Sequence, residues 1–159
     1  MPHLNVEIKA SCQNHEAIRA ILKAHKADFK GTDHQVDTYF KVTNGRLKLR
    51  EGNIENFLVF YERENQPGPK ASAVSLFKNE PNSSLKELLT KSLTILTVVD
   101  KQREIYFIDN VKFHLDTVKD LGTFVEIEAI DKANNLYISS GEYIRKITAN
   151  GTINTIAGI

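Results

Sequence analysis

Apolar and polar residues alternate along several short segments of the chain, which is the pattern typical of a half-buried β-strand. In residues 4–10, LNVEIKA, the apolar side chains share one face, while Glu7 and Lys9 lie on the other. The same alternation predicts further strands at residues 35–42, 46–51, 55–64, 73–78, 94–108, 111–118 and 122–130.

Helical patterns interrupt these strands twice. A helix is predicted from Asn14, a candidate N-cap, to the residues just before Gly31. Ser84 and Glu87 have the spacing of a capping box, which predicts a second, short helix. The Asn-Gly pair at 44–45 is typical of a hairpin turn. Eight strands, mostly joined by hairpins, indicate an α+β fold built on an antiparallel, closed or nearly closed eight-stranded β-barrel with a few outer helices.

Composition narrows the class of protein. The chain has 159 residues, 41% apolar and 26% charged, as expected for one globular domain. Its net charge of +1 provides no overall field to attract nucleic acid or an acidic membrane, so neither is expected as a partner. Cys12 is the single cysteine, which excludes an intrachain disulfide and a cysteine-based zinc site. Because no long apolar run is present, we expect a cytoplasmic protein.

Charges on the predicted strands are segregated by sign. Arg46, Lys48 and Arg50 share one face of their strand, whereas Glu126 and Glu128 share a face of another. Such faces could be the solvated outside of a sheet, and edge strands often carry Lys. A solubilising surface usually mixes signs, however, and like charges directly across a sheet repel. The segregation therefore favours a polyanion bound by the cations and a metal bound by the carboxylates.

A barrel with a charged interior must hold water and a ligand, because unpaired buried charge is too costly. A triphosphate suits the cationic faces, since its oxygens accept charge-assisted hydrogen bonds from Arg and Lys. Mg²⁺ or Mn²⁺ suits the carboxylates, because these hard cations take oxygen ligands and bridge phosphates.

Residues 5–9, Asn-Val-Glu-Ile-Lys, resemble the E-x-E-x-K signature of the CYTH domain, or triphosphate tunnel metalloenzymes. This family includes class IV adenylate cyclases, thiamine triphosphatases and inorganic triphosphatases. The segments DTYFKVTNGRLKLRE, YERENQPGPKAS and KQREIYFIDNVKFHLDTVKDLGTFVEIEAID are similar to the family in the same order, most of all to its bacterial class IV cyclase-like branch. The resemblance covers about residues 3–131 and implies an eight-stranded antiparallel tunnel, with the triphosphate inside and helices outside.

By motif position, the resemblance also implies the residues of the site. The implied substrate-binding residues are Lys9, Arg46, Lys48, Arg50, Arg63, Lys70, Lys101 and Arg103. The implied metal ligands are Glu7, Asp116, Glu126 and Glu128, and the implied catalytic residues are Lys9 and Asp116.

Some positions carry a weaker signal. Asn5 departs from the family signature, which removes one negative charge and could weaken a second metal site. Asp37 and Tyr39 could shape the tunnel mouth or hold a cation, and strand packing explains them equally well. His114 shares a face with Asp116 and is expected to pack beside the site rather than to catalyse.

Residues 132–159, KANNLYISSGEYIRKITANGTINTIAGI, resemble a different family, the NHL repeat. Three short strands are expected here, but one propeller blade cannot bury its faces, so we expect the tail to pair with the sheet or stay partly disordered. The chain is thus divided into a CYTH-like domain, residues 1–131, and a tail that is not an independent domain. The family's usual helix is missing at this place, which would uncover part of the outer wall and favour self-association, for example as a homodimer.

Three functions are compatible with this sequence. The first is metal-dependent hydrolysis of an inorganic or organic triphosphate, such as tripolyphosphate, thiamine triphosphate or ATP. The second is a class IV adenylate cyclase, in which the ribose 3′-OH of ATP attacks the α-phosphorus to give cyclic AMP and pyrophosphate. The third is a non-catalytic polyphosphate or nucleotide binder. The sequence shows no definite adenine pocket, so we expect hydrolysis ahead of cyclisation.

Overall fold

The computed structural model of the protein describes residues 3–65, 67, 70–131, 136–140, 143–147 and 153–158. The strands of the main sheet are β1 (His3–Ser11), β2 (Asp28–Phe40), β3 (Arg46–Gly52), β4 (Phe57–Glu62), β5 (Lys70–Lys78), β6 (Ile95–Ile108), β7 (Val111–Val118) and β8 (Gly122–Asp131). The helices are α1 (His15–Ala24) and α2 (Leu85–Ser92). None of the helices described is long and apolar enough to cross a membrane.

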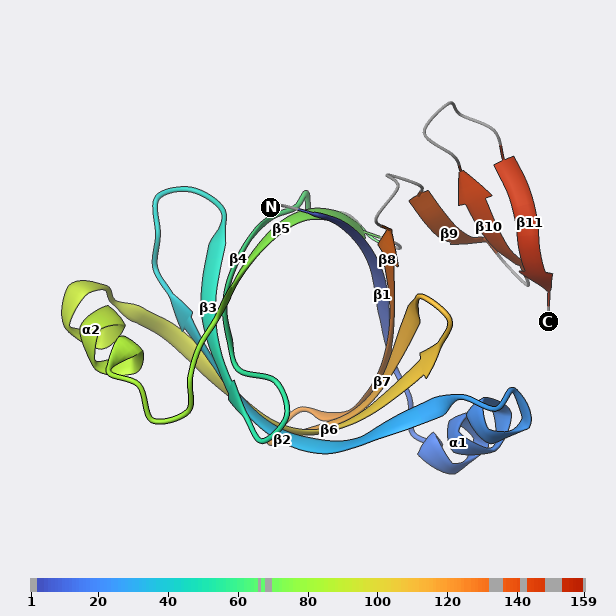
Figure 1. The fold of residues 1–159 in the computed structure, drawn as a ribbon, viewed down its shortest axis with the longest axis horizontal. Helices are drawn as coiled ribbons and strands as arrows, with labels where there is room; N and C mark the ends of the chain where they lie inside the picture. The colour runs from blue at the N-terminus through green and yellow to red at the C-terminus, as the bar shows by residue number, and fades with distance from the viewer. Residues whose placement is uncertain are drawn as a thin grey trace.

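The eight strands form a closed antiparallel barrel in the order β1-β5-β4-β3-β2-β6-β7-β8, with β8 pairing back onto β1. Figure 1 looks along this barrel and shows it as a ring with both helices outside. The expectation of an antiparallel eight-stranded barrel with outer helices is therefore confirmed. Closure leaves no free sheet edge, so every strand contributes one face to the interior.

Helix α1 lies against the outer wall of the barrel. Its Leu22 is almost fully buried, and Arg19 donates to Glu104 on the outer face of β6. The His15 ring contacts the backbone oxygen of Phe124 in β8 at 3.0 Å. These contacts hold the helix on the outside of the barrel and leave the inward strand faces free to line its interior.

The helix boundaries differ from those that the sequence predicts. Helix α1 ends well before Gly31, because Lys26 adopts a positive φ of 54° and the N–H of Ala27 donates back to Leu22 O at 2.9 Å. Gly31 instead lies within β2, at a register shift against β6, with φ of 123°. Ser84 does precede α2, but its side chain makes no capping hydrogen bond, so the expected capping box is not formed.

The three strands expected in the tail are present as β9 (Leu136–Ser140), β10 (Tyr143–Ile147) and β11 (Ile153–Gly158). They form their own antiparallel sheet in the order β11-β10-β9 beside the barrel (Figure 1). They do not extend the barrel sheet, because β1 and β8 already pair with each other. The expectation that the tail joins that sheet is therefore wrong.

Candidate active site

The barrel encloses a cavity of about 670 Å³ whose wall is built from the charged faces of the strands. Most of the residues implied by the sequence line it: Glu7, Lys9, Lys48, Arg50, Arg63, Lys70, Lys101, Arg103, Glu126 and Glu128. Two further residues lie differently. Arg46 donates to Asn65 Oδ1 at 2.5 Å in an exposed contact, and Asp116 is fully buried behind Arg103. Strand parity therefore brings side chains from all eight strands of the barrel into one space.

Asp37 is the centre of a cationic cluster on β2, β3 and β6. Arg50 donates to both of its carboxylate oxygens at 2.9 Å, and the ammonium groups of Lys48 and Lys101 lie 3.2 and 3.3 Å away. Burial alone would raise the pKa of Asp37, but these cations hold it well below its usual range. One buried carboxylate thus holds three cations together on one wall of the cavity.

Lys101 is the weakly charged member of that cluster. Its side chain is only 6% exposed. Burial, together with the nearby charges of Arg103 and Arg50, lowers the pKa of Lys101 to about 7. A polyanion placed beside this side chain would favour its protonated ammonium form.

Arg103 is fixed on the neighbouring wall by Asp116. Two nitrogens of its guanidinium donate to the two carboxylate oxygens of Asp116, at 2.7 and 2.6 Å. Arg103 also approaches Glu126 Oε1 at 3.4 Å, and Lys9 Nζ lies 3.5 Å from Asp116 and 3.7 Å from Glu126. The two hydrogen bonds from Arg103 to Asp116 orient the guanidinium in the cavity wall.

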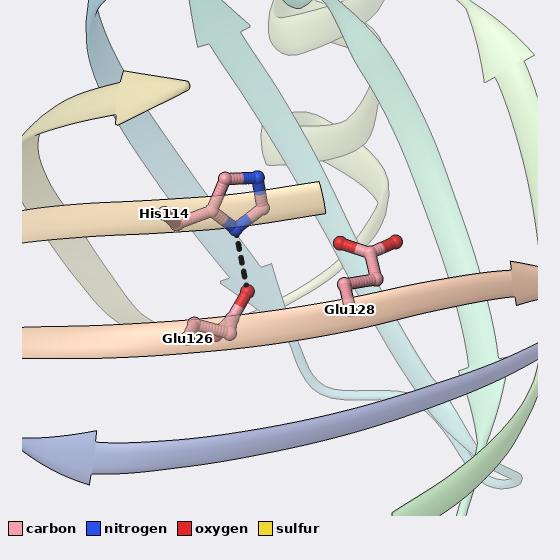
Figure 2. Close-up of side chains that lie close together, drawn as sticks. All are labelled: His114, Glu126 and Glu128. Carbon is pink, nitrogen blue, oxygen red and sulfur yellow. Dashed lines mark hydrogen bonds and ion pairs between the residues drawn. The ribbon is translucent and has the colours of Figure 1, made fainter. Parts of the chain in front are cut away.

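His114, Glu126 and Glu128 offer three ligand atoms that all lie within 4.8 Å of one another. Figure 2 shows the imidazole on β7 facing Glu126 on β8, with a 2.9 Å contact between Nδ1 and Oε1. The other ring nitrogen, Nε2, is buried without a hydrogen-bond partner in the described part of the chain. Burial, with Arg103 nearby, lowers the pKa of His114 to about 4, so the ring is neutral near pH 7 and can act as a ligand.

Glu128 lies in an excess of negative charge. It is directly opposite Glu7 on β1, and burial together with the charges of Glu126 and Glu7 raises its pKa despite Lys112. Asn5 donates to Glu128 Oε1 at 2.9 Å, where a carboxylate would add further repulsion. The departure from the family signature thus replaces a like charge by a hydrogen-bond donor.

The residues present fit a divalent cation. Like charges that face each other across a sheet are destabilising, and a cation between them removes that cost. Carboxylate oxygens suit Mg²⁺ and Mn²⁺, and an imidazole nitrogen suits transition metals such as Mn²⁺ better than Mg²⁺. Asp116 is not among the residues that the structure brings together here, since its oxygens face Arg103.

Two charged residues of the cavity, Glu55 and Lys112, are not among the site residues predicted from the sequence. The predicted strand 55–64 begins at Glu55, but β4 begins at Phe57, so Glu55 lies in the loop between β3 and β4. It forms a close ion pair with Lys112 of β7. Lys112 has the same parity as His114 and Asp116, so the strand pattern contained a signal for it.

One sector of the wall is apolar. Phe57, Val59 and Tyr61 of β4 and Val74 and Leu76 of β5 line the cavity, and Val59, Tyr61 and Val74 pack into a buried cluster. Strands β4 and β5 are neighbours in the barrel, so this surface is continuous. The cavity therefore combines a charged wall with an apolar one.

A family model, the CYTH domain, matches residues 3–156. The match extends past residue 131 into the tail, whose resemblance to an NHL repeat finds no support in these comparisons. Among the curated proteins, none matches the chain.

Solved structures share the fold. The PH1012 protein from Pyrococcus horikoshii OT3 is 26% identical, with a TM-score of 0.67 over 83% of this chain and 80% of that chain. A proposed adenylate cyclase from Vibrio parahaemolyticus is 17% identical, with a TM-score of 0.64 over 84% of this chain and 80% of that one. HpAC1 from Hippeastrum, a proposed adenylyl cyclase with a dominant triphosphatase activity, is 15% identical, with a TM-score of 0.57 over 80% of each chain.

Proposed function

The chain belongs to the CYTH domain family, and from that premise we propose that it is a metal-dependent enzyme that binds a triphosphate in the barrel cavity and hydrolyses it. One observation carries the proposal: cationic side chains from several strands share a single cavity with Glu126 and Glu128, which lie within ligand distance of the buried His114. The cations would neutralise the negative charge of a triphosphate, and a divalent metal would neutralise the acidic group. The HpAC1 structure, whose protein is described with triphosphatase activity, supports hydrolysis as the first candidate.

In this proposal the residues of the cationic wall bind and orient the phosphates. Lys48 and Lys101 act as point charges, and Asp37 keeps both of them in place. Arg103, oriented by Asp116, presents its guanidinium to phosphate oxygens. Holding these donors in position before the reaction lowers the barrier, because charge that develops on the phosphoryl oxygens meets donors already oriented.

The acidic wall would hold the metal through Glu126, Glu128 and His114, with Glu7 across the sheet. A divalent cation bound there supplies charge neutralisation and polarises the phosphoryl group. Lys9, whose side chain is 41% exposed, lies beside the acidic wall near Glu126 and can swing toward a phosphate oxygen. We propose Lys9 as a residue that contacts the substrate, and Asp116 as one that acts through Arg103.

Cyclisation of ATP is the second candidate function. The apolar sector formed by Phe57, Val59 and Leu76 favours it, because inorganic triphosphate has no group that gains from apolar contact. An organic triphosphate could place its base or ring on that surface while its phosphates meet the cations. The same surface also suits hydrolysis of an organic substrate.

A substrate panel tests the proposal. ATP, thiamine triphosphate and tripolyphosphate are incubated with Mg²⁺ or Mn²⁺, and released phosphate and cyclic AMP are both measured. Phosphate release from at least one substrate is expected, and Glu126→Gln should abolish it while Glu51→Gln, on the outer face of β3, should not. Cyclic AMP as the main product supports the second candidate. Binding without turnover in either metal contradicts both and leaves a non-catalytic binder.

A further inference from the structure

The loop between β3 and β4, residues 53–56, is anchored at one end of the barrel by a buried carboxylate. Asp33 of β2 has no exposed surface and accepts hydrogen bonds from the backbone N–H groups of Ile54 at 2.8 Å and Glu55 at 3.0 Å. Asn56 closes the loop onto Gly52 by two further hydrogen bonds, of 3.1 and 2.7 Å. The loop lies next to β2 in the ring of Figure 1, and its backbone is fixed.

From this fixed loop, the Glu55 side chain reaches into the cavity and pairs with cations of two strands. It forms a close ion pair with Lys112 of β7 and accepts from Arg50 Nη1 at 3.1 Å. Gln35 donates to the same carboxylate at 3.1 Å. Burial alone would raise the pKa of Glu55, but Lys112 and Arg50 lower it to about 2, so it is an anion at neutral pH.

The ion pair spans part of the barrel. Strands β2 and β6 separate β3 from β7, so Glu55 and Lys112 meet across two intervening strands. Both residues lie at the end of the barrel where β3 passes to β4 and β6 passes to β7. Arg50 donates to Asp37 through Nε and Nη2, so Glu55 occupies its third nitrogen, Nη1, which could otherwise donate to a phosphate.

The opposite end of the barrel carries three cationic residues, one of which, Arg63, forms a close ion pair with Glu7. Arg46 is the first residue of β3, Lys70 is the first residue of β5, and Arg63 directly follows β4. Antiparallel pairing places these positions together at the end away from the β3–β4 loop. An ion pair thus lies at one end of the cavity, while the other end carries three cationic residues.

We propose that the Glu55–Lys112 ion pair bars one end of the cavity, so that a linear polyphosphate enters only from the basic end and only its terminal phosphates are bound. This inference rests on the proposed function, since it concerns the same phosphate path. Glu55 takes the place of a phosphate on Arg50 and Lys112 and thereby sets how many phosphates the cavity accepts. Additional phosphates of a longer chain remain outside and add little to affinity.

The test measures affinity against chain length. Calorimetric titrations use pyrophosphate, tripolyphosphate, tetrapolyphosphate and a longer linear polyphosphate, in a buffer with chelator so that no turnover occurs. For the wild-type protein, the affinity per chain end should rise with length and then level off. In Glu55→Gln the levelling should come at a longer chain, with the longest polyphosphate bound about tenfold more tightly, the contribution of about one charge-assisted hydrogen bond.

Two further variants make the result specific. Glu51→Gln removes the same charge from β3 on the outer face, where Glu51 pairs with Lys86 at 2.6 Å, and should behave as wild type. Gly52→Ala changes no charge, but its Cβ would lie 2.7 Å from the Asp33 carboxylate oxygens and from the backbone oxygen of Glu55, so it should displace the loop. Gly52→Ala should therefore move the levelling of affinity to longer polyphosphates, as Glu55→Gln does. It replaces Glu55→Gln in the test if that variant does not fold. Thermal unfolding identifies the folded variants.

The outcomes separate the inference from the proposed function. If the wild-type affinity keeps rising with chain length, or if both cavity variants level off where Glu51→Gln does, the bar does not exist and triphosphate binding stands. If no oligophosphate binds to the wild-type protein, the proposed function is overturned and this inference with it.

Discussion

Two carboxylates inside the barrel, the buried Asp37 and the cavity-lining Glu128, have opposite electrostatic surroundings. Asp37 is contacted by three cationic side chains, which hold its pKa well below the usual range. Glu128 faces Glu7 and Glu126, and burial together with these neighbours raises its pKa. The protein therefore supplies the positive charges that balance Asp37, whereas it balances the negative charge of Glu128 only in part. In the proposed function, the difference separates a carboxylate that would hold phosphate-binding cations in place from one that a bound metal would stabilise.

The largest effect is expected from removing the charge of Asp37. In Asp37→Asn, the cations of Arg50, Lys48 and Lys101 lose a buried partner, which should lower the free energy of unfolding by about 3–5 kcal/mol. Urea denaturation measures this loss. Asp100→Asn, which removes a half-exposed carboxylate paired with His34, should cost at most about 1 kcal/mol. Equal losses in the two variants would show that Asp37 is not the centre of the cluster.

The opposite sign is expected for Glu128. A carboxyl with a raised pKa is less stable ionised in the folded state than in the unfolded chain, so at pH 7 neutralising it removes a destabilising charge. In chelator, Glu128→Gln should unfold at the same or a higher urea concentration than wild type. Mn²⁺ affinity, followed by electron paramagnetic resonance, should fall at least about tenfold, the lower range seen when the surroundings of a metal site are altered. If Glu128→Gln were destabilised and its Mn²⁺ affinity unchanged, Glu128 would be a structural carboxylate like Asp37 and not a metal ligand.

The pH dependence of tripolyphosphate binding tests the role of Lys101 in the cluster around Asp37. Its pKa of about 7 means that the free protein loses this positive charge as the pH rises from 6.5 to 8.5. Tripolyphosphate affinity should therefore fall over that range by about tenfold, because each pKa unit corresponds to about 1.4 kcal/mol. Lys101→Arg stays charged and should show a flatter profile, and comparing the two cancels the titration of the phosphate itself. Identical slopes would exclude Lys101 as the titrating group.

The smallest effect is expected from removing Arg46, which does not line the cavity. Arg46 is exposed enough that solvent screens it, and it donates to Asn65 rather than to a buried carboxylate. Arg46→Ala should weaken tripolyphosphate binding by at most about 1 kcal/mol, or roughly fivefold, and high salt should remove the difference. Lys86→Ala, on α2 outside the barrel, serves as the control. A loss larger than that of a cavity lysine would place Arg46 within the phosphate path.

Alternation along the strands was sufficient to predict the barrel and most of its interior charges. Lys48, Lys101 and Glu126 face the cavity because parity leaves a residue on a closed barrel only two directions. The pattern fails over residues 28–34, DFKGTDH, which do not alternate cleanly. These residues are in β2 because they pair with β6 along its length, across a register shift near Gly31. That long-range pairing is not encoded in the local pattern.

The same limit applies to the site. Glu55 lies in a loop, and its direction depends on hydrogen bonds from the loop backbone to Asp33, which is twenty-two residues away in the chain. His114 could be placed on the face of Asp116, but its contact with Glu126 depends on the β7–β8 register. Asp116 was implied as a ligand by motif position, while its pairing with Arg103 follows from the β6–β7 register. Roles that depend on pairs of strands needed the structure.

Tripolyphosphate titration of Lys48→Met tests the central claim, that inward-facing cations bind a triphosphate inside the barrel, most directly. Lys48 lines the cavity with its side chain only 14% exposed, and Asp37 keeps Arg50 and Lys101 as partners when it is removed. In chelator, the wild-type protein should bind one tripolyphosphate per chain, and Lys48→Met should bind it at least about tenfold more weakly, whereas Lys86→Met should not differ from wild type. Wild-type protein that does not bind tripolyphosphate, or a Lys48→Met variant with unchanged affinity, would contradict the claim.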